Sequence, residues 1–217
     1  MDPAQAAQQV ALVVASLAPI VNPVAAAPLF LSLTRNAPEG FRRQQAARAA
    51  LYSMAILSGF LLLGNAIIDA FGISLPGIRV AGGLIVLVLA FRMLFSGDAE
   101  ADTVRGGAED IRRAQVDVSF TPLAMPTLAG PGSIALVMTL GADIPSGQQL
   151  SGHLVVLLGV AITCLLSWAT LLSAGWLSRF LGDHGIQAIT KIMGFLLACI
   201  AVQFIFSGVE GFMRAMA

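Results

Sequence analysis

The stretch LAPIVNPVAAAPLF, residues 17–30, places three prolines inside the first long apolar run of the chain. Proline lacks a backbone N–H and clashes with the preceding helical turn, so each one costs a helix interior about 3 kcal/mol. The stretch PLAMPTLAGPGSIA, residues 122–135, carries three more. The two sets match at a constant separation of 103 residues, with Pro122 after Pro19, Pro126 after Pro23 and Pro131 after Pro28. We interpret this match as an internal repeat.

The composition of the chain indicates that it lies in a lipid bilayer and not in water. Of its 217 residues, 57% are hydrophobic and 11% are charged, whereas a soluble domain has about 25% charged residues. No Asp, Glu, Lys or Arg occurs in residues 3–34, 49–68, 118–142 or 144–178. Uncharged apolar stretches of about 20 residues are typical of transmembrane helices. We therefore expect an integral membrane protein, and the net charge of zero gives no indication of nucleic-acid binding.

The apolar pattern predicts an all-α membrane protein with six transmembrane helices. We expect them at residues 10–33, 46–70, 79–95, 118–140, 154–177 and 189–209. The longest polar segment, residues 96–117, divides the chain almost in half. The expected organisation is one membrane domain that contains a three-helix repeat at 1–95, a polar cytoplasmic linker at 96–117 and a second three-helix repeat at 118–217.

Three spans in each half, an odd number, make the second half enter the membrane from the opposite face. A weaker match supports the repeat, because RVAGGLIVLVLA (79–90) aligns with KIMGFLLACIAV (191–202) and pairs Arg79 with Lys191 and Gly82 with Gly194. Inverted-topology repeats are characteristic of secondary transporters, whose sites lie near the membrane midplane between broken helices. We expect the first and fourth spans to be the broken ones, at their Pro/Gly motifs. This architecture predicts alternating access.

The breaks themselves predict a binding site. A proline at position i leaves the carbonyl at i−4 without its helical donor, so Pro23 frees the carbonyl of Pro19 and Pro126 frees that of Pro122. Such groups need a polar cavity inside a membrane, and the half-helix that begins after each break suits an anion. The expected substrate-binding residues are Asn22, Pro23, Ala25, Thr127, Gly130, Pro131, Gly132 and Ser133. The simpler interpretation is that the prolines only kink packed helices.

A zwitterionic amino acid suits two antiparallel broken helices. The N-terminus at Gly132 and Ser133 would receive its carboxylate, while carbonyls near Pro19 and Val24, with Asn22, would receive its ammonium group or a coupling cation, H⁺ or Na⁺. Its side chain would face residues 25–27, which leaves room for little beyond a methyl or hydroxymethyl group. The expected substrates are therefore glycine, alanine and serine.

Two other classes of function stay open. An intramembrane enzyme needs a nucleophile beside a base; no GxSxG or HExxH motif occurs, but distant residues remain free to converge. A passive channel is also compatible with an inverted repeat.

No cofactor and no metal site is expected, because Cys164 and Cys199 lack metal-ligand spacing. The expected partners are a small-molecule substrate and the lipid bilayer, with a homo-oligomer left open. Four glycines are expected to be close-packing sites between helices: Gly59, Gly64, Gly82 and Gly83.

Three segments of the chain resemble the MarC family. NPVAAAPLFLSLT in the first span and PLAMPTLAGPGSIA in the fourth look like the two signature segments of that family, and GFLLACIAVQFIFSG at 194–208 resembles its last span. One departure is Ala25, where the family often has glycine. The resemblance implies a transporter of small neutral amino acids in the bacterial inner membrane, whereas no residue here argues for drug efflux.

Basic residues predict the orientation. Ten of the twelve Lys and Arg residues lie in or beside the loops after odd-numbered spans, and the other two are Arg79 and Arg214. Because cytoplasmic loops carry the excess of basic residues, these loops are expected at 35–45, 96–117 and 179–188, with both termini outside. Single cysteines introduced at residues 105 and 147 should differ in intact cells, with only residue 147 labelled from outside. The reverse labelling pattern would contradict this orientation.

Overall fold

The computed structural model describes residues 3–34, 37–95 and 117–216, and all regular structure in these ranges is helical. Its elements in chain order are α1 (Pro3–Val21), α2 (Pro23–Thr34), α3 (Glu39–Phe71), α4 (Leu75–Phe95), η1 (Ser119–Leu128), α6 (Pro131–Ala142), η2 (Ser146–Gln148), α7 (Gln149–Leu172) and α8 (Ala174–Met216). A helix pairs its backbone groups internally, as hydrocarbon requires. The expected linker at 96–117 lies outside the described residues, apart from Asp117.

The helices have the length and surface of membrane spans. Five are long and apolar enough to cross a bilayer, and the bent pair of η1 and α6 would make a sixth. Their outward faces carry large apolar side chains, among them Leu62, Leu84, Val88, Leu158, Leu165 and Phe195. Apolar surface on this scale is stable only against lipid or another protein. The expectation of an all-helical integral membrane protein is confirmed.

The expected first span, residues 10–33, corresponds to two helices. The helix α1 ends at Val21 and α2 begins at Pro23, with Asn22 between them. The helix α1 also begins at Pro3, earlier than expected, and is long enough by itself to count as a candidate span. Pro19 lies inside α1 and Pro28 lies inside α2, so the helices continue through these two prolines. The interruption comes directly before Pro23.

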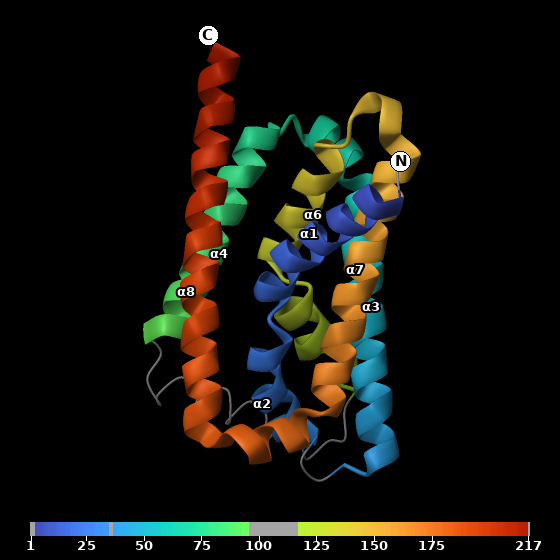
Figure 1. The fold of residues 1–217 in the computed structure, drawn as a ribbon, viewed down its shortest axis with the longest axis vertical. Coiled ribbons are helices and arrows are strands. Elements are labelled where there is room, and N and C mark those ends of the chain that lie inside the picture. The colour runs from blue at the N-terminus through green and yellow to red at the C-terminus, as the bar shows by residue number, and fades with distance from the viewer. Residues whose placement is uncertain (1–2, 35–36, 96–116, 217) are drawn as a thin grey trace.

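The expected end of the fifth span at residue 177 and the loop expected at 179–188 are wrong. The helix α7 ends at Leu172, and α8 begins at Ala174 with a first part that runs along the lower end of the molecule (Figure 1). Gly182 then redirects α8 with φ 62° and ψ 178°, a conformation essentially restricted to glycine. The apolar run hid the turn because Trp176 and Phe180 continue it.

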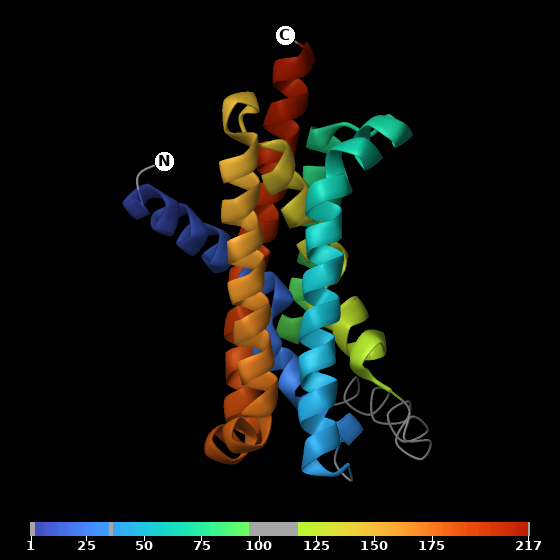
Figure 2. The same ribbon diagram turned by 90° about the vertical axis from the view of Figure 1, so that its right-hand side faces the viewer.

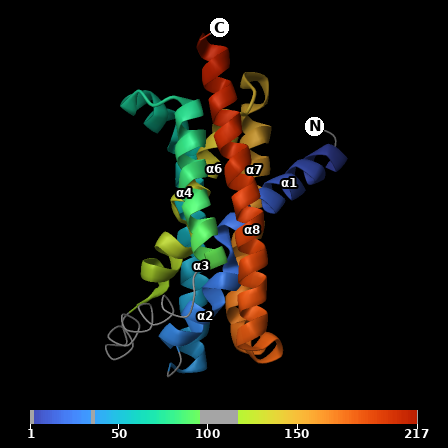
Figure 3. The same ribbon diagram turned by 90° about the vertical axis from the view of Figure 1, so that its left-hand side faces the viewer.

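In the view of Figure 1 the two interrupted elements, α1–α2 and η1–α6, lie between the pairs of continuous helices, and the first part of α1 projects away from the bundle (Figure 2). On one side α3 lies along α7 (Figure 2), and on the other α4 lies along α8 (Figure 3). The helix α6 packs against α3 and α4, whereas α2 packs against α7 and α8. The helix α1 packs against α7, and η1 packs against α3. Both ends of the chain lie toward the same end of the molecule (Figure 1).

One apolar cluster joins the centre of the bundle to one of its sides. Fully buried side chains from five elements meet in it: Leu17, Leu57, Leu123, Val137 and Val160. Lipid tails are as apolar as these side chains, so their burial holds the helices together through close packing more than through the hydrophobic effect. The side of the bundle formed by α4 and α8 has a smaller cluster of its own around Val86 and Ala201.

Polar contacts hold the start of η1 against α3. The side-chain oxygen of the fully buried Gln45 accepts a hydrogen bond from the N–H of Val118 at 2.9 Å, and Arg48 pairs with Asp117 at 2.7 Å. Asp117 also accepts hydrogen bonds from the hydroxyl and the N–H of Ser119. The hydroxyl of Ser119 and then Arg48 keep the pKa of the Asp117 carboxyl below its ordinary value.

Glycines bring several helices into close contact, as expected. A Cβ atom at Gly82 would lie 2.6 Å from Cβ of Ala135 on α6, and one at Gly83 would lie 2.8 Å from Cγ1 of Ile205 on α8. Gly64 is tight against Met138. The expectation for Gly59 is wrong, because a Cβ there would meet no neighbouring atom within 4 Å.

Gly82→Val is expected to destabilise the folded protein by about 1–3 kcal/mol, because the new side chain must displace Ala135. Gly59→Val is the matched control, since it adds the same atoms to open space and should cost less than about 0.5 kcal/mol. Thermal unfolding in detergent micelles measures both variants. Equal losses in the two would contradict the close contact of α4 with α6.

Candidate functional site

The first interruption is built around Asn22. Asn22 has φ +44°, a left-handed conformation that asparagine tolerates better than most residues, and its N–H donates to the carbonyl of Ala18 at 2.9 Å. Its side-chain oxygen accepts a hydrogen bond from the N–H of Ala25 at 3.3 Å. This is an N-cap of α2, and Pro23 follows at the first helical position, where no N–H is needed. The dipeptide Asn-Pro therefore ends one helix and begins another.

The amide nitrogen of Asn22 points away from this cap. It donates to Sδ of Met93 on α4 at 3.4 Å, and the Asn22 residue is 8% exposed. A thioether sulfur is a weak acceptor, so this donor is held by a weaker bond than a carbonyl or carboxylate would give. The side-chain oxygen of Asn22 thus caps α2, whereas its amide nitrogen would bond more strongly to an oxygen acceptor than to Met93.

The second interruption lies between η1 and α6. Thr121 and Met125 inside η1 have extended backbones, because each precedes a proline, and proline disfavours the helical conformation of the residue before it. Ala129 and Gly130 follow in non-helical conformations, and α6 begins at Pro131. The two helical segments meet at an angle of 62°. The break between η1 and α6 thus lies at the residues equivalent to 26–27, inside α2, whereas Met125, the residue equivalent to Asn22, is a further non-helical position inside η1.

Side chains next to the second break already bond its backbone. The hydroxyl of Thr127 donates to the carbonyl of Pro122 at 2.7 Å, so the carbonyl that we expected to be free has a partner from the same segment. The hydroxyl of Ser133 donates to the carbonyl of Gly130 at 2.9 Å. In this conformation both expected site hydroxyls stabilise the break itself, and a ligand would have to replace these bonds.

The two glycines beside Pro131 are tightly surrounded. A Cβ at Gly130 would lie 2.6 Å from the carbonyl oxygen of Pro126, and one at Gly132 would lie 2.6 Å from Cγ2 of Val86 and 3.3 Å from Cγ2 of Ile20. Because Ile20 is two residues before Asn22, Gly132 is where the two interruptions meet. Gly132 here contacts side chains of α1 and α4, so a larger residue at this position would disturb packing as well as any ligand.

The remaining expected residues divide by exposure. Ser133 is buried, Pro23, Ala25 and Thr127 are partly buried, and Pro131 is exposed. Pro131 lines a hollow of about 550 Å³ between α4, η1 and α6. Other residues of this hollow were missed by the sequence argument, among them Gly77, Ala81, Met125 and Met138. Their only signal is the four-residue spacing of Gly77 and Ala81, which does not reveal which helix this face of α4 meets.

Comparison with known proteins identifies the family. A model of the MarC family, described as integral membrane proteins, matches residues 7–213. The chain belongs to the MarC family. The inner membrane protein MarC of Citrobacter koseri is 38% identical over 200 residues, which cover 89% of this chain and 90% of that protein. The proteins of the same name from Escherichia coli K12 and Shigella flexneri are 36% identical over 199 residues, with the same coverage. No solved structure gives a significant match.

Membership in the MarC family confirms the resemblance expected from the two proline motifs. The names of the relatives place those proteins in the inner membrane, in agreement with the apolar helices of this chain. The names state no substrate and no activity.

Two substitutions at Asn22 should separate the contribution of its side-chain cap to stability from that of its left-handed backbone conformation. Asn22→Gly removes the cap but accepts a positive φ, and should cost less than about 1 kcal/mol. Asn22→Ala removes the cap and strains the backbone, and should cost about 2 kcal/mol in total. Thermal unfolding in detergent should give the highest unfolding temperature for the wild type, a lower one for the glycine variant and the lowest for the alanine variant. An alanine variant as stable as the glycine variant would contradict the left-handed conformation.

Proposed function

We propose that this MarC-family protein is a secondary transporter of small neutral amino acids that works by alternating access around α1–α2 and η1–α6. Its two halves are then inverted repeats, each with one interrupted element followed by two continuous helices. Both termini lie on the outer side of the membrane in this proposal. The coupling ion, if the transport is coupled, is a proton or a sodium ion.

The pattern of helix contacts carries the proposal. Exchange of the two halves replaces α1 by η1, α2 by α6, α3 by α7 and α4 by α8. Under this exchange the contact of α1 with α7 becomes that of η1 with α3, and the contacts of α2 with α7 and α8 become those of α6 with α3 and α4; all of these contacts are present. The contacts of α3 with α7 and α4 with α8 map onto themselves. The smaller contacts of α1 with α8 and α6 with α7 have no counterpart of similar extent.

This exchange symmetry is what alternating access requires. If each half can adopt the conformation of the other, the same protein has two states of nearly equal energy that open to opposite sides. The helix pairs α3–α7 and α4–α8 flank the centre on both sides, and the interrupted elements between them consist of shorter helices than these four. Motion of the interrupted elements against these pairs would expose the site alternately.

The polar side chains at the two breaks are uncharged. Side chains at the breaks that carry polar atoms are the amide of Asn22 and the hydroxyls of Thr127 and Ser133. In the proposed bound state the N-terminus of α6 receives the substrate carboxylate, and Asn22 with carbonyls near Pro19 receives its ammonium group. The buried Ala26 and Ala27, each 2% exposed, leave room for only a small substrate side chain.

The hollow beside the second break gives the substrate a place to approach. Its volume of about 550 Å³ exceeds that of a small amino acid, and it reaches from Ile73 to Pro126 and Pro131. Its walls are apolar, so the charges of a zwitterion must be met by backbone groups at the break. Selection for a small side chain therefore takes place at the break, whereas the hollow by itself would favour larger apolar amino acids.

Uptake of labelled alanine into proteoliposomes tests the proposal. Uptake should saturate and exchange with internal alanine, and glycine and serine should compete. Ethylamine and acetate, which each lack one charge, should compete at least about tenfold less well, because each loses a charge-assisted hydrogen bond. Equal competition by these analogues, or by leucine, would contradict a site for small zwitterions. Flux that does not saturate would indicate a channel, and chemical conversion of the substrate would indicate an enzyme.

Thr127→Val should reduce alanine uptake about fivefold or more, because it removes a hydroxyl at nearly constant volume from the proposed site. Thr170→Val on α7 is the matched control, since the Thr170 hydroxyl makes the same kind of bond, to the carbonyl of Leu166 at 2.8 Å, and Thr170 is partly buried like Thr127 but lies outside the two breaks. Uptake is compared at equal amounts of folded protein in the vesicles. Equal uptake by the two variants would remove Thr127 from the site.

A further inference from the structure

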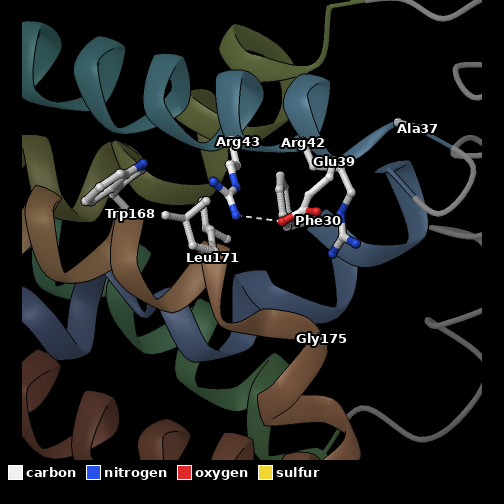
Figure 4. Close-up of a pocket in the computed structure, with 9 residues that line it drawn as sticks. Phe30, Ala37, Glu39, Arg42, Arg43, Trp168, Leu171 and Gly175 are labelled. Atoms are coloured by element: carbon white, nitrogen blue, oxygen red, sulfur yellow. Dashed lines mark hydrogen bonds and ion pairs between the residues drawn. The ribbon is translucent and has the colours of Figure 1, made fainter.

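A second cavity lies at the lower end of the bundle, where α2 ends, α3 begins and α7 passes into α8 (Figure 4). It has a volume of about 650 Å³, and its walls include Phe30, Glu39, Arg42, Arg43, Trp168 and Gly175. We call it the end pocket. None of the residues expected to bind substrate lines the end pocket.

Arg42 gives the end pocket a positive charge that no described acidic residue neutralises. Its guanidinium lies 6.0 Å from the centre of the Phe30 ring, and its Nε is shielded from solvent with no hydrogen-bond partner in the described chain. The neighbouring Arg43 is already paired, through a 2.7 Å contact with Glu39. A contact with an aromatic face does not replace an anion, because an arginine held in a partly buried position is stabilised most by a bidentate carboxylate or phosphate.

Trp168 supplies a second donor that has no partner. Its ring nitrogen Nε1 is buried and makes no hydrogen bond within the described residues. It lies across the end pocket from Arg42 (Figure 4), one helical turn before the end of α7 and therefore deeper in the bundle. Leu171 lines the pocket between them. A small anion at Arg42 would leave Trp168 unpaired, whereas an elongated ligand with a charged end, an apolar part and a deeper acceptor would satisfy both.

The end pocket also lies at a depth suited to lipid headgroups. Gly175 in its wall belongs to the first part of α8, which runs along the end of the bundle (Figure 1). On that part Trp176 is 66% exposed and Phe180 is 73% exposed, and their rings stack at 5.3 Å. Exposed aromatic side chains at the end of a membrane helix are typical of the membrane–water interface. Basic pockets between helices on the cytoplasmic side bind anionic headgroups.

We propose that the end pocket binds an anionic phospholipid, with the headgroup phosphate at Arg42 and an ester carbonyl accepting a hydrogen bond from Nε1 of Trp168. The bound lipid would join α2, α3, α7 and α8 at one end of the bundle. The site is separate from the proposed transport site and stands whether or not the chain transports amino acids. A free phosphate ion, which offers the same charged group without the ester, is the rival ligand.

Native mass spectrometry of the full chain in detergent tests the proposal with phosphatidylglycerol, phosphatidylcholine and inorganic phosphate as probes. The wild type should bind phosphatidylglycerol about fivefold or more tightly than phosphatidylcholine. Arg42→Gln should weaken phosphatidylglycerol binding about tenfold, and Trp168→Phe, which removes only the donor, about threefold. Arg214→Gln is the control, because it removes the same charge from an exposed residue paired with Glu210 on the last turns of α8, and should leave binding unchanged.

A second measurement separates binding from folding. Phosphatidylglycerol should raise the unfolding temperature of the wild type and of Arg214→Gln but not that of Arg42→Gln. If Arg42→Gln does not fold, Arg42→Lys keeps the charge without the planar fork and should bind with intermediate affinity. Unchanged binding in the Arg42 variants would overturn the proposal. Displacement of the lipid by equimolar inorganic phosphate, with no effect of Trp168→Phe, would overturn it in favour of a free-anion site.

Discussion

Backbone polar groups inside a bilayer must find their partners within the protein, and the rest of this structure follows from how the chain meets that demand where proline prevents a regular helix. Asn22 caps α2 with its side chain, Thr127 donates to the carbonyl of Pro122, and Ser133 donates to that of Gly130. The chain therefore repairs its breaks with neutral side chains that lie beside them. The same groups are the polar atoms that a ligand at the breaks would meet.

The demand for internal pairing also explains the position of the interrupted elements. Irregular backbone is tolerated at membrane depth only where protein surrounds it, so α1–α2 and η1–α6 lie in the middle and the continuous helices flank them. Close approach is possible because glycine occupies the contact positions, as at Gly82 against Ala135 and Gly132 against Val86. Lipid provides no hydrophobic force between helices, so these contacts decide which faces meet. In the proposed transport cycle the flanking pairs would serve as a frame against which the interrupted elements move.

The described ion pairs between different helices lie toward the ends of the bundle, where the solvation of charged groups costs least. Arg48 with Asp117 holds one end of the second half, and Arg79 pairs with Asp143 near the other at 2.6 Å. At the end formed by α2, α3, α7 and α8 this pairing is incomplete, because Arg42 has no acidic partner among the described residues. In the proposed site the missing charge comes from an anionic lipid headgroup, because such headgroups surround the ends of membrane helices. The lipid is thus expected to complete a polar contact that the protein leaves open.

The sequence by itself determined the class of protein and the family, and its proline motifs indicated that helices are interrupted near them, because hydropathy, proline and the Asn-Pro cap act through local physics that needs no neighbour. It also indicated the repeat, through prolines at a constant separation. It failed at residues 174–177, where an apolar segment continues the span in sequence but has left it in space, at residues 179–188, which belong to α8 and not to a loop, and at Gly59, which faces open space. Only the tertiary structure decided that Gly132 meets Val86 and Ile20, that Thr127 occupies the carbonyl of Pro122, and that Arg42 and Trp168 share a cavity. These relations depend on which helix faces approach one another, and in lipid that choice is made by packing between residues distant in the chain, which no local pattern records.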